Sequence, residues 1–161
     1  MQIPDINIKH VLYATDHSEN AQFAFAYAAS IADRYGAKLT LLHVMPEFPD
    51  SSIFDMNIER SVSAKKWLTI KKEYLQSAKE ELISKTRADF GRDVNDNYDI
   101  VVETGSPSQM IMLVAAERQC DFIVMGLKGK GTLTDPLMGD TVRRVLHQSK
   151  QPVLVVQPPT P

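Results

Sequence analysis

The amino-acid sequence predicts a single α/β domain, built on a doubly wound, five-stranded parallel sheet with helices on both faces. Short and continuously apolar segments are typical of strands that are buried on both faces. Helical segments alternate with them, which favours parallel pairing joined by right-handed crossovers. The length of 161 residues suits one domain with a substantial core.

The expected elements follow one another along the whole chain. Strands are expected at 8–15, 38–45, 98–103, 121–126 and 152–156, and helices at 20–35, 62–90, 107–119 and 140–148. The apolar stripe of the long second helix is expected to face inward, and its members are Trp67, Ile70, Tyr74, Leu75, Ala78, Leu82 and Ile83. Segment 46–61 interrupts the pattern, and its apolar residues suit either a lid over a ligand or a partner surface.

Composition narrows the class of protein. A net charge of −2 and a pI near 6.1 give no general attraction to nucleic acid or to an anionic membrane. The single cysteine, Cys120, excludes an internal disulfide and suits a reducing compartment, where it would act as a small hydrophobic residue. The chain shows neither a signal peptide nor an apolar run of about 20 residues that could span a bilayer. We therefore expect a cytoplasmic protein without nucleic-acid or membrane partners.

A candidate site follows from the predicted sheet. Ligands of open α/β sheets bind beyond the carboxyl ends of the strands, where the strand order reverses. This rule directs attention to Ala14–Asp16, to Val44 and to the residues from Met125 onward. Its place at such a strand end favours a ligand role for Asp16 over the alternative, a cap of the first helix, while Ser18 is expected to be a cap or turn residue. His17 is expected to be exposed, and His43 to be a satisfied core or interface histidine.

The segment from Gly126 to Thr141 is rich in glycine and joins the fourth strand to the last helix. Glycines let backbone N–H groups approach phosphate oxygens, and the helix that begins near Gly139 adds the positive end of its dipole. Possible countercharges are Lys128, Lys130, Arg143 and Arg144. A solvated connecting loop is the alternative interpretation. Neither GxxxxGK[ST] nor a GxGxxG fingerprint after the first strand is present.

The sequence resembles the universal stress protein (UspA-like) family over nearly its whole length. The resemblance rests on VLYATDHS at 11–18, His43-Val44, Gly105-Ser106-Pro107, DFIVMG at 121–126 with Gly126-x2-Gly129-x9-Gly139, and PVLVV at 152–156. It implies an adenine nucleotide alpha-hydrolase-like fold over 1–157, followed by a flexible tail at 158–161. It also implies a homodimer formed through the last strand, by Val153, Leu154, Val155 and Val156.

The ATP-binding branch of that family implies a site for ATP or AMP. Asp16 would bind the adenosine end, Met125 and Gly126 the ribose, and Gly129 and Gly139 the phosphates. The implied nucleotide-binding residues are Ala14, Thr15, Asp16, Val44, Met125, Gly126, Lys128, Gly129, Gly139, Asp140, Thr141 and Val142. No catalytic residue and no metal-ligand pattern is expected.

One residue departs from the motif of that branch, G-x2-G-x9-G-[ST], because Asp140 stands where a hydroxyl is expected. At about 4 Å and an effective dielectric of about 20, a carboxylate would oppose a phosphate charge by roughly 4 kcal/mol. Thr141 could supply the hydroxyl, Mg²⁺ could bridge Asp140 to the phosphates, or the nearby cations could offset the charge. Asp140 is also expected to cap the last helix.

The sequence therefore favours a stress-response signalling module that binds ATP or AMP with little or no hydrolysis. The alternative is a universal stress protein that has lost nucleotide binding and acts through protein contacts. An ATPase or nucleotidyl-transfer enzyme is disfavoured, because the first strand lacks an SGGxDS-type phosphate loop.

Overall fold

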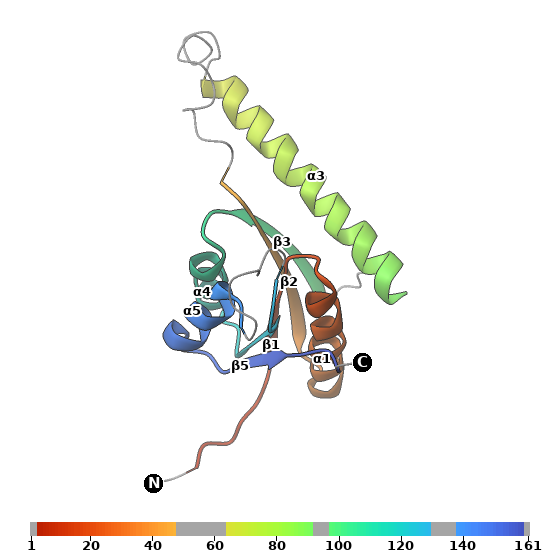
Figure 1. Ribbon diagram of the computed structural model, residues 1–161, viewed down its shortest axis with the longest axis vertical. Helices are drawn as coiled ribbons and strands as arrows, with labels where there is room; N and C mark the ends of the chain where they lie inside the picture. The colour runs from red at the N-terminus through yellow and green to blue at the C-terminus, as the bar shows by residue number, and fades with distance from the viewer. Residues whose placement is uncertain (1–2, 48–63, 92–96, 130–137, 160–161) are drawn as a thin grey trace.

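A computed structural model describes residues 3–47, 64–91, 97–129 and 138–159 (Figure 1). Its strands are β1 (His10–Thr15), β2 (Lys38–Met45), β3 (Tyr98–Thr104), β4 (Phe122–Gly126) and β5 (Val153–Val156). Its helices are α1 (Glu19–Tyr35), α3 (Ala64–Phe90), α4 (Pro107–Glu117) and α5 (Asp140–Gln148).

The strands form one five-stranded sheet in the order β3-β2-β1-β4-β5, and every pair is parallel. The predicted doubly wound sheet is therefore confirmed. Helices α1 and α3 cover one face, while α4 and α5 lie together on the other (Figure 1). Strand β1 lies at the centre, between β2 and β4, so the strand order reverses there.

The core has one layer on each face of the sheet. Val11 and Tyr13 of β1 pack toward α1, whereas Leu12 and Ala14 pack toward α4 and α5. Successive side chains of a strand point to opposite faces, so a strand covered on both sides must be apolar throughout. The buried Tyr13 hydroxyl donates a hydrogen bond to the Ala21 carbonyl of α1 at 2.6 Å. That bond ties the central strand to the start of α1.

Several element ends differ by one or two residues from the sequence-based expectation, and three of these differences have a local reason. Strand β1 begins at His10 because the Asp121 carboxylate accepts the N–H groups of Lys9 and His10, at 2.7 and 3.0 Å. Strand β5 begins after Pro152, which has no N–H to donate. Helix α4 ends at Glu117, and Gln119 adopts a left-handed φ of 53°.

Helix α3 contains the main error in the predicted core. It is 27 residues long, which corresponds to about 40 Å, whereas the seven residues of β3 span only about 23 Å. Its amino-terminal part therefore extends beyond the sheet (Figure 1). Ala78 and Leu82 are buried as predicted, but Ile70 and Tyr74 are exposed. The Trp67 side chain lies outside the described residues.

Several expectations fall on segments that the structure does not describe. They concern the possible lid or partner surface in 46–61, of which only 46–47 is described, and the last two residues of the predicted tail. Among the described residues, no helix combines the length and the apolar character needed to cross a bilayer.

Both ring nitrogens of His10 have hydrogen-bond partners, and burial favours the neutral imidazole. Its Nδ1 lies 3.0 Å from the Arg118 carbonyl, which can only accept, so Nδ1 carries the proton. Its Nε2 lies 2.8 Å from the hydroxyl of Thr40, which is fully buried and donates to it. Burial of the imidazole lowers the pKa of His10, although the bond to Arg118 acts in the opposite direction.

We predict that His10 makes the fold less stable in mild acid. The unfolded chain binds a proton on His10 at a higher pH than the folded chain does, so the free energy of unfolding falls as the pH drops through the ordinary histidine pKa of about 6.5. Urea unfolding at several pH values should give a smaller decline for His10→Gln than for the wild type. The exposed His147→Gln is the matched control, and equal slopes for wild type and His10→Gln would contradict the prediction.

Candidate functional site

A cleft of about 510 Å³ opens at the carboxyl ends of β1, β2 and β4. Its volume lies within the range usual for small-molecule sites. All of the predicted nucleotide-binding residues border it: Ala14, Thr15, Asp16, Val44, Met125, Gly126, Lys128, Gly129, Gly139, Asp140, Thr141 and Val142. The structure therefore has a cleft where the sequence predicted a site, at the strand ends where the strand order reverses.

The turn after β1 is fixed by short side-chain hydrogen bonds to the backbone. Thr15 Oγ1 accepts from the N–H of His17 at 3.1 Å, and Asp16 Oδ1 accepts from the N–H of Ser18 at 3.0 Å. Ser18 Oγ accepts from the Ala21 N–H at 3.2 Å, so Ser18 is the N-cap of α1 as expected. The alternative that Asp16 caps this helix is therefore wrong.

Two glycines allow the loop after β4 to approach this turn closely. A Cβ on Gly126 would lie 2.8 Å from the backbone carbon of Asn20, in the first turn of α1. A Cβ on Gly129 would collide with Asp16 Oδ2. Position 126 therefore needs glycine for lack of space against backbone, whereas a side chain at position 129 would have to displace the Asp16 carboxylate. The carboxylate of Asp16 is consequently set between the turn after β1 and the loop after β4.

The amino end of α5 borders the cleft and corrects one expectation. The N-cap is Gly139, and Asp140 is the first helical residue, so Asp140 does not cap the helix. The Gly139 N–H donates to the Leu127 carbonyl at 3.1 Å, which fixes where the helix starts. No side chain caps this end in the described part of the chain, so the N–H groups of the first turn can bond to water or a ligand.

The Asp140 side chain is largely exposed and lies 3.7 Å from the guanidinium of Arg143, one turn along α5. Arg143 thus offsets the Asp140 charge on the surface of the helix, and it does not border the cleft. Arg144 does not border it either. Lys128 does, and it is half-buried, whereas Lys130 lies outside the described residues. Residues 130–137 of the glycine loop are likewise not described.

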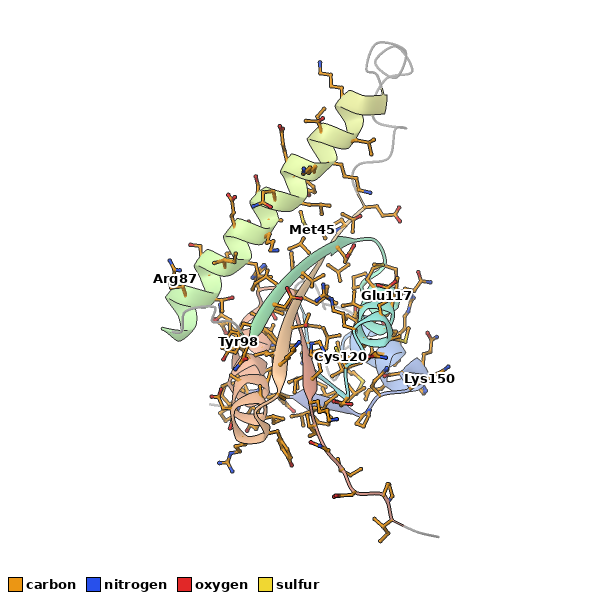
Figure 2. The ribbon with its side chains drawn as sticks, turned by 180° about the vertical axis from the view of Figure 1, so that it is seen from behind. Met45, Arg87, Tyr98, Glu117, Cys120 and Lys150 are labelled. Carbon is orange, nitrogen blue, oxygen red and sulfur yellow. The ribbon has the colours of Figure 1, made fainter. Side chains whose placement is uncertain are left out.

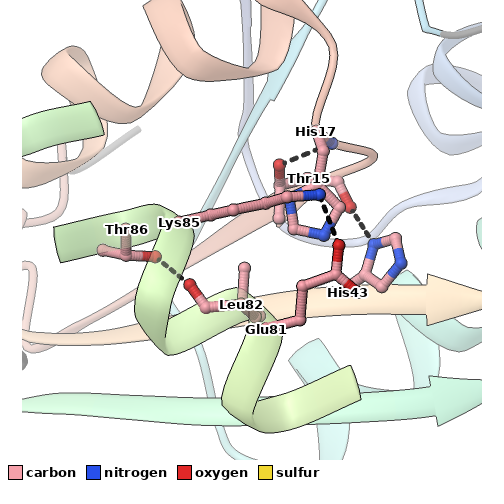
Figure 3. Close-up of polar contacts among 7 residues, drawn as sticks. All are labelled: Thr15, His17, His43, Glu81, Leu82, Lys85 and Thr86. Atoms are coloured by element: carbon pink, nitrogen blue, oxygen red, sulfur yellow. Dashed lines mark hydrogen bonds and ion pairs between the residues drawn. The ribbon is translucent and has the colours of Figure 1, made fainter. Parts of the chain in front are cut away.

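His43 lines the cleft, and Figure 3 shows it beside Glu81 of α3. Its Nδ1 donates to the Thr15 carbonyl at 2.8 Å, so it is a satisfied histidine as expected. The His17 ring lies against it, with centroids 4.4 Å apart. His17 was expected to be exposed, but its left-handed φ of 62° turns it back and leaves it half-buried.

Helix α3 adds an ion pair beside these rings (Figure 3). Glu81 lies 2.6 Å from Lys85 Nζ, one turn further along the helix. The hydrogen bond from Lys85 and its positive charge lower the pKa of Glu81, and the two histidines act in the same direction. The pair is exposed to solvent, so it contributes little to stability.

The cleft also includes residues that sequence reasoning missed: Ala21, Leu42, His43, Pro46, Pro107 and Ile111. Leu42 lies two residues before Val44, so strand alternation could have placed it on the same face. Pro107 and Ile111 are four apart on α4 and share a helix face by the same kind of reasoning. Which helix would cover that end of the sheet could not be read from the sequence.

Cys120 is buried at 4% exposure, and burial raises the pKa of its thiol to about 11. The expectation that it acts as a small hydrophobic residue is confirmed, because it packs in the layer formed with α4 and α5. In the part of the chain that is described, no group of three or more histidine, cysteine, aspartate or glutamate side chains is arranged to hold a metal.

The sheet and its cleft define a doubly wound α/β protein with a hollow at the carboxyl ends of its strands. The model of the universal stress protein family matches residues 7–157, and the chain belongs to this family. A relative is universal stress protein MJ0577 of Methanocaldococcus jannaschii. It is 30% identical over 158 residues, which cover 92% of this chain and 94% of the relative.

Solved structures agree with this assignment. The structure of MJ0577 superimposes with a TM-score of 0.67 at 26% identity, covering 97% of this chain and all of that one. A universal stress protein in complex with cAMP gives a TM-score of 0.61 at 22% identity, with 94% and 98% covered. That from Archaeoglobus fulgidus in complex with dAMP gives 0.54 at 20% identity, with 92% and 96% covered. The last two show a shared fold.

We predict that Gly126→Ala destabilises the protein. The new methyl group would meet the backbone of α1, which cannot yield without shifting the helix. Such overpacking costs about 1–3 kcal/mol and should lower the midpoint of thermal unfolding by several degrees. Calorimetry of Ser30→Ala, an exposed position on α1, provides the control. An unchanged midpoint for Gly126→Ala would show that the loop after β4 can move away freely.

Proposed function

We propose that this protein is a stress-response signalling module that binds an adenine nucleotide, ATP or AMP, in the cleft at the ends of β1 and β4. One observation carries the proposal: three groups line the same cleft. They are the Asp16 carboxylate, the glycines that follow β4 from Gly126, and the amino end of α5. Relatives of the same fold in complex with cAMP and dAMP are compatible with it.

Each group suits one part of a nucleotide. A carboxylate accepts hydrogen bonds, so Asp16 suits the amino group of adenine or the hydroxyls of ribose. Gly126 and Gly129 have no side chain to occupy the cleft beside β4, and the amino end of α5 favours negative charge, so this end of the cleft suits phosphate. The apolar side chains of Val44 and Met125 suit the base. We propose that hydrolysis is slow or absent, and that Mg²⁺ accompanies a triphosphate.

A second candidate function rests on Asp140. Its carboxylate stands at the rim of the cleft, where phosphate would lie. If its charge dominated, the protein would act through protein contacts without a nucleotide. Its pairing with Arg143 and its exposure favour the first proposal, because both reduce the charge that a phosphate would meet.

Isothermal titration tests nucleotide binding. We expect ATP and AMP to bind the wild type with a dissociation constant below about 1 mM, which corresponds to roughly −4 kcal/mol. Gly129→Val should lose at least about tenfold in affinity, because its side chain displaces Asp16 and fills the cleft. Titrations with and without Mg²⁺ separate a metal-bridged triphosphate from direct binding. No heat at millimolar ATP and AMP would rule out the proposal in favour of protein contacts alone.

Asp140→Ser is the control variant for the phosphate end. Because the carboxylate is exposed and paired with Arg143, we expect it to raise ATP affinity by less than about threefold, and AMP affinity less still. A gain of a hundredfold or more for ATP would show that Asp140 faces the phosphates. Circular dichroism on each variant checks that the fold is kept.

We further propose that two copies pair through the edge of β5. The strand is apolar and carries no charge, which is typical of an edge that is covered. The Pro152 carbonyl accepts from the N–H of Ile123 in β4, and the Val156 carbonyl accepts from the N–H of Leu127 just after β4, at 2.9 Å each. Since alternate residues of a strand direct their backbone groups to the same side, Val153 and Val155 direct theirs to the open edge.

Val155→Pro is expected to abolish the dimer and keep the fold. It removes one outward N–H and leaves the pairing with β4 intact. Val155→Thr keeps the N–H and is the matched control, which should remain dimeric. Sedimentation equilibrium measures the result. A monomeric wild type, or a dimeric Val155→Pro, would contradict pairing through this edge.

A further inference from the structure

A second hollow lies beside β3, the edge strand at the other side of the sheet from β5, and away from the proposed nucleotide cleft. It is a groove of about 420 Å³ between α3 and β3. Its floor is formed by residues 100–102 of β3, one wall by α3, and the other side by Arg118, which follows α4. Figures 1 and 2 show α3 running beside β3. The residues that line this groove differ from those of the proposed nucleotide site and of the proposed dimer edge.

The floor of the groove is the open edge of a strand. Among the described residues, β3 pairs only with β2. The Asn97 carbonyl accepts from Leu39 and the Gly105 N–H donates to Met45, so both ends of the strand direct these groups toward β2. Because the direction alternates along a strand, Ile100 and Val102 direct their N–H and C=O groups to the open edge. An extended chain could bond to them.

The walls of the groove are positively charged. Lys71, Lys72 and Lys79 line it from α3, and no ion pair in the described part of the chain involves them. Arg118 stands on the other face of β3, where it pairs with Asp99. Leu68 and Leu75 add apolar surface between the lysines, and Leu68 is 70% exposed.

We propose that this groove, which we call the β3-edge groove, binds an extended acidic segment of a partner protein as an added strand. Backbone bonds to Ile100 and Val102 would align the segment, as in other cases of strand addition. Its side chains would alternate between the two faces. Those facing α3 would be acidic and meet the lysines.

The charges decide between possible occupants. A second copy of this edge would bring its own lysines against Lys71, Lys72 and Lys79, which is repulsive, whereas an acidic segment is attracted. Single-stranded nucleic acid is also negative, but it uses aromatic side chains for stacking. None of the described residues that line the groove is aromatic. An acidic peptide therefore fits best.

The test uses a fluorescent peptide of alternating valine and glutamate, as long as β3, with acetylated and amidated ends. Fluorescence anisotropy should show saturable binding that weakens as salt is added. The double variant Lys71→Glu with Lys72→Glu should bind at least about tenfold more weakly, because two attractive charges become repulsive. The exposed pair Lys9→Glu with Lys150→Glu makes the same change in net charge elsewhere and should bind like the wild type.

Two further probes test the added strand itself. A peptide with proline at alternate valines cannot donate those backbone bonds and should bind at least about tenfold more weakly. In amide exchange by NMR, the N–H groups of Ile100 and Val102 should gain protection when the first peptide binds. Equal binding of the proline peptide, or equal losses in both lysine pairs, would overturn the proposal.

Other occupants have distinct outcomes. An oligothymidine that binds as tightly as the peptide and depends on the same lysines would replace the acidic strand with nucleic acid. The wild type could instead self-associate at low micromolar concentration and lose this association in the double variant Lys71→Glu with Lys72→Glu. That result would make a second copy of the chain, and not an acidic segment, the occupant of the groove. Failure of the acidic peptide to bind at millimolar concentration would overturn strand addition. None of these three outcomes changes the result expected from the nucleotide titration, because the groove and the cleft are separate surfaces.

Discussion

The structure depends on the contact between the turn after β1 and the loop after β4. Strand β1 is paired on both sides, so its two neighbours end at the same edge of the sheet. Gly126 then lies against the first turn of α1, and Gly129 lies against Asp16. Tyr13 holds the start of α1 from below through its bond to Ala21. The turn after β1 and the loop after β4, which are more than a hundred residues apart in the sequence, are thereby fixed next to each other. Both border the cleft.

Much of the fold and of the candidate site could be predicted from the sequence, because both depend on local patterns. Continuous apolar runs identify buried strands, and the carboxyl ends of parallel strands must meet at one edge. Asp16, Gly126 and Gly129 could therefore be brought together without coordinates. Ser18 could be recognised as a cap from its position before an alanine-rich helix. These inferences need only the two-residue repeat of a strand, the 3.6-residue turn of a helix and a doubly wound sheet.

The errors have a different origin, since they depend on how far one element extends past another. The apolar stripe of α3 continues through Ile70, but the sheet beneath it ends sooner. Asp140 was displaced from the cap by a single residue, because Gly139 bonds to Leu127 and sets the start of α5. His17 is half-buried because of one left-handed φ. Lengths, a one-residue shift and a single dihedral angle are properties of the assembled structure, and no residue pattern encodes them.

The alanine-rich face of α1 has a further consequence. Its buried residues toward the sheet include Ala24, Ala28, Ala29 and Ala32, so the helix backbone lies close to the strands. A gap filled by methyl groups cannot accept a larger side chain unless the whole helix retreats, and retreat would open the contact at Gly126. Larger side chains are therefore excluded at these four alanine positions, although Phe25 is accommodated on the same helix. The amino-terminal half of α3 is not packed in this way against any described element, so larger side chains fit there without moving the helix.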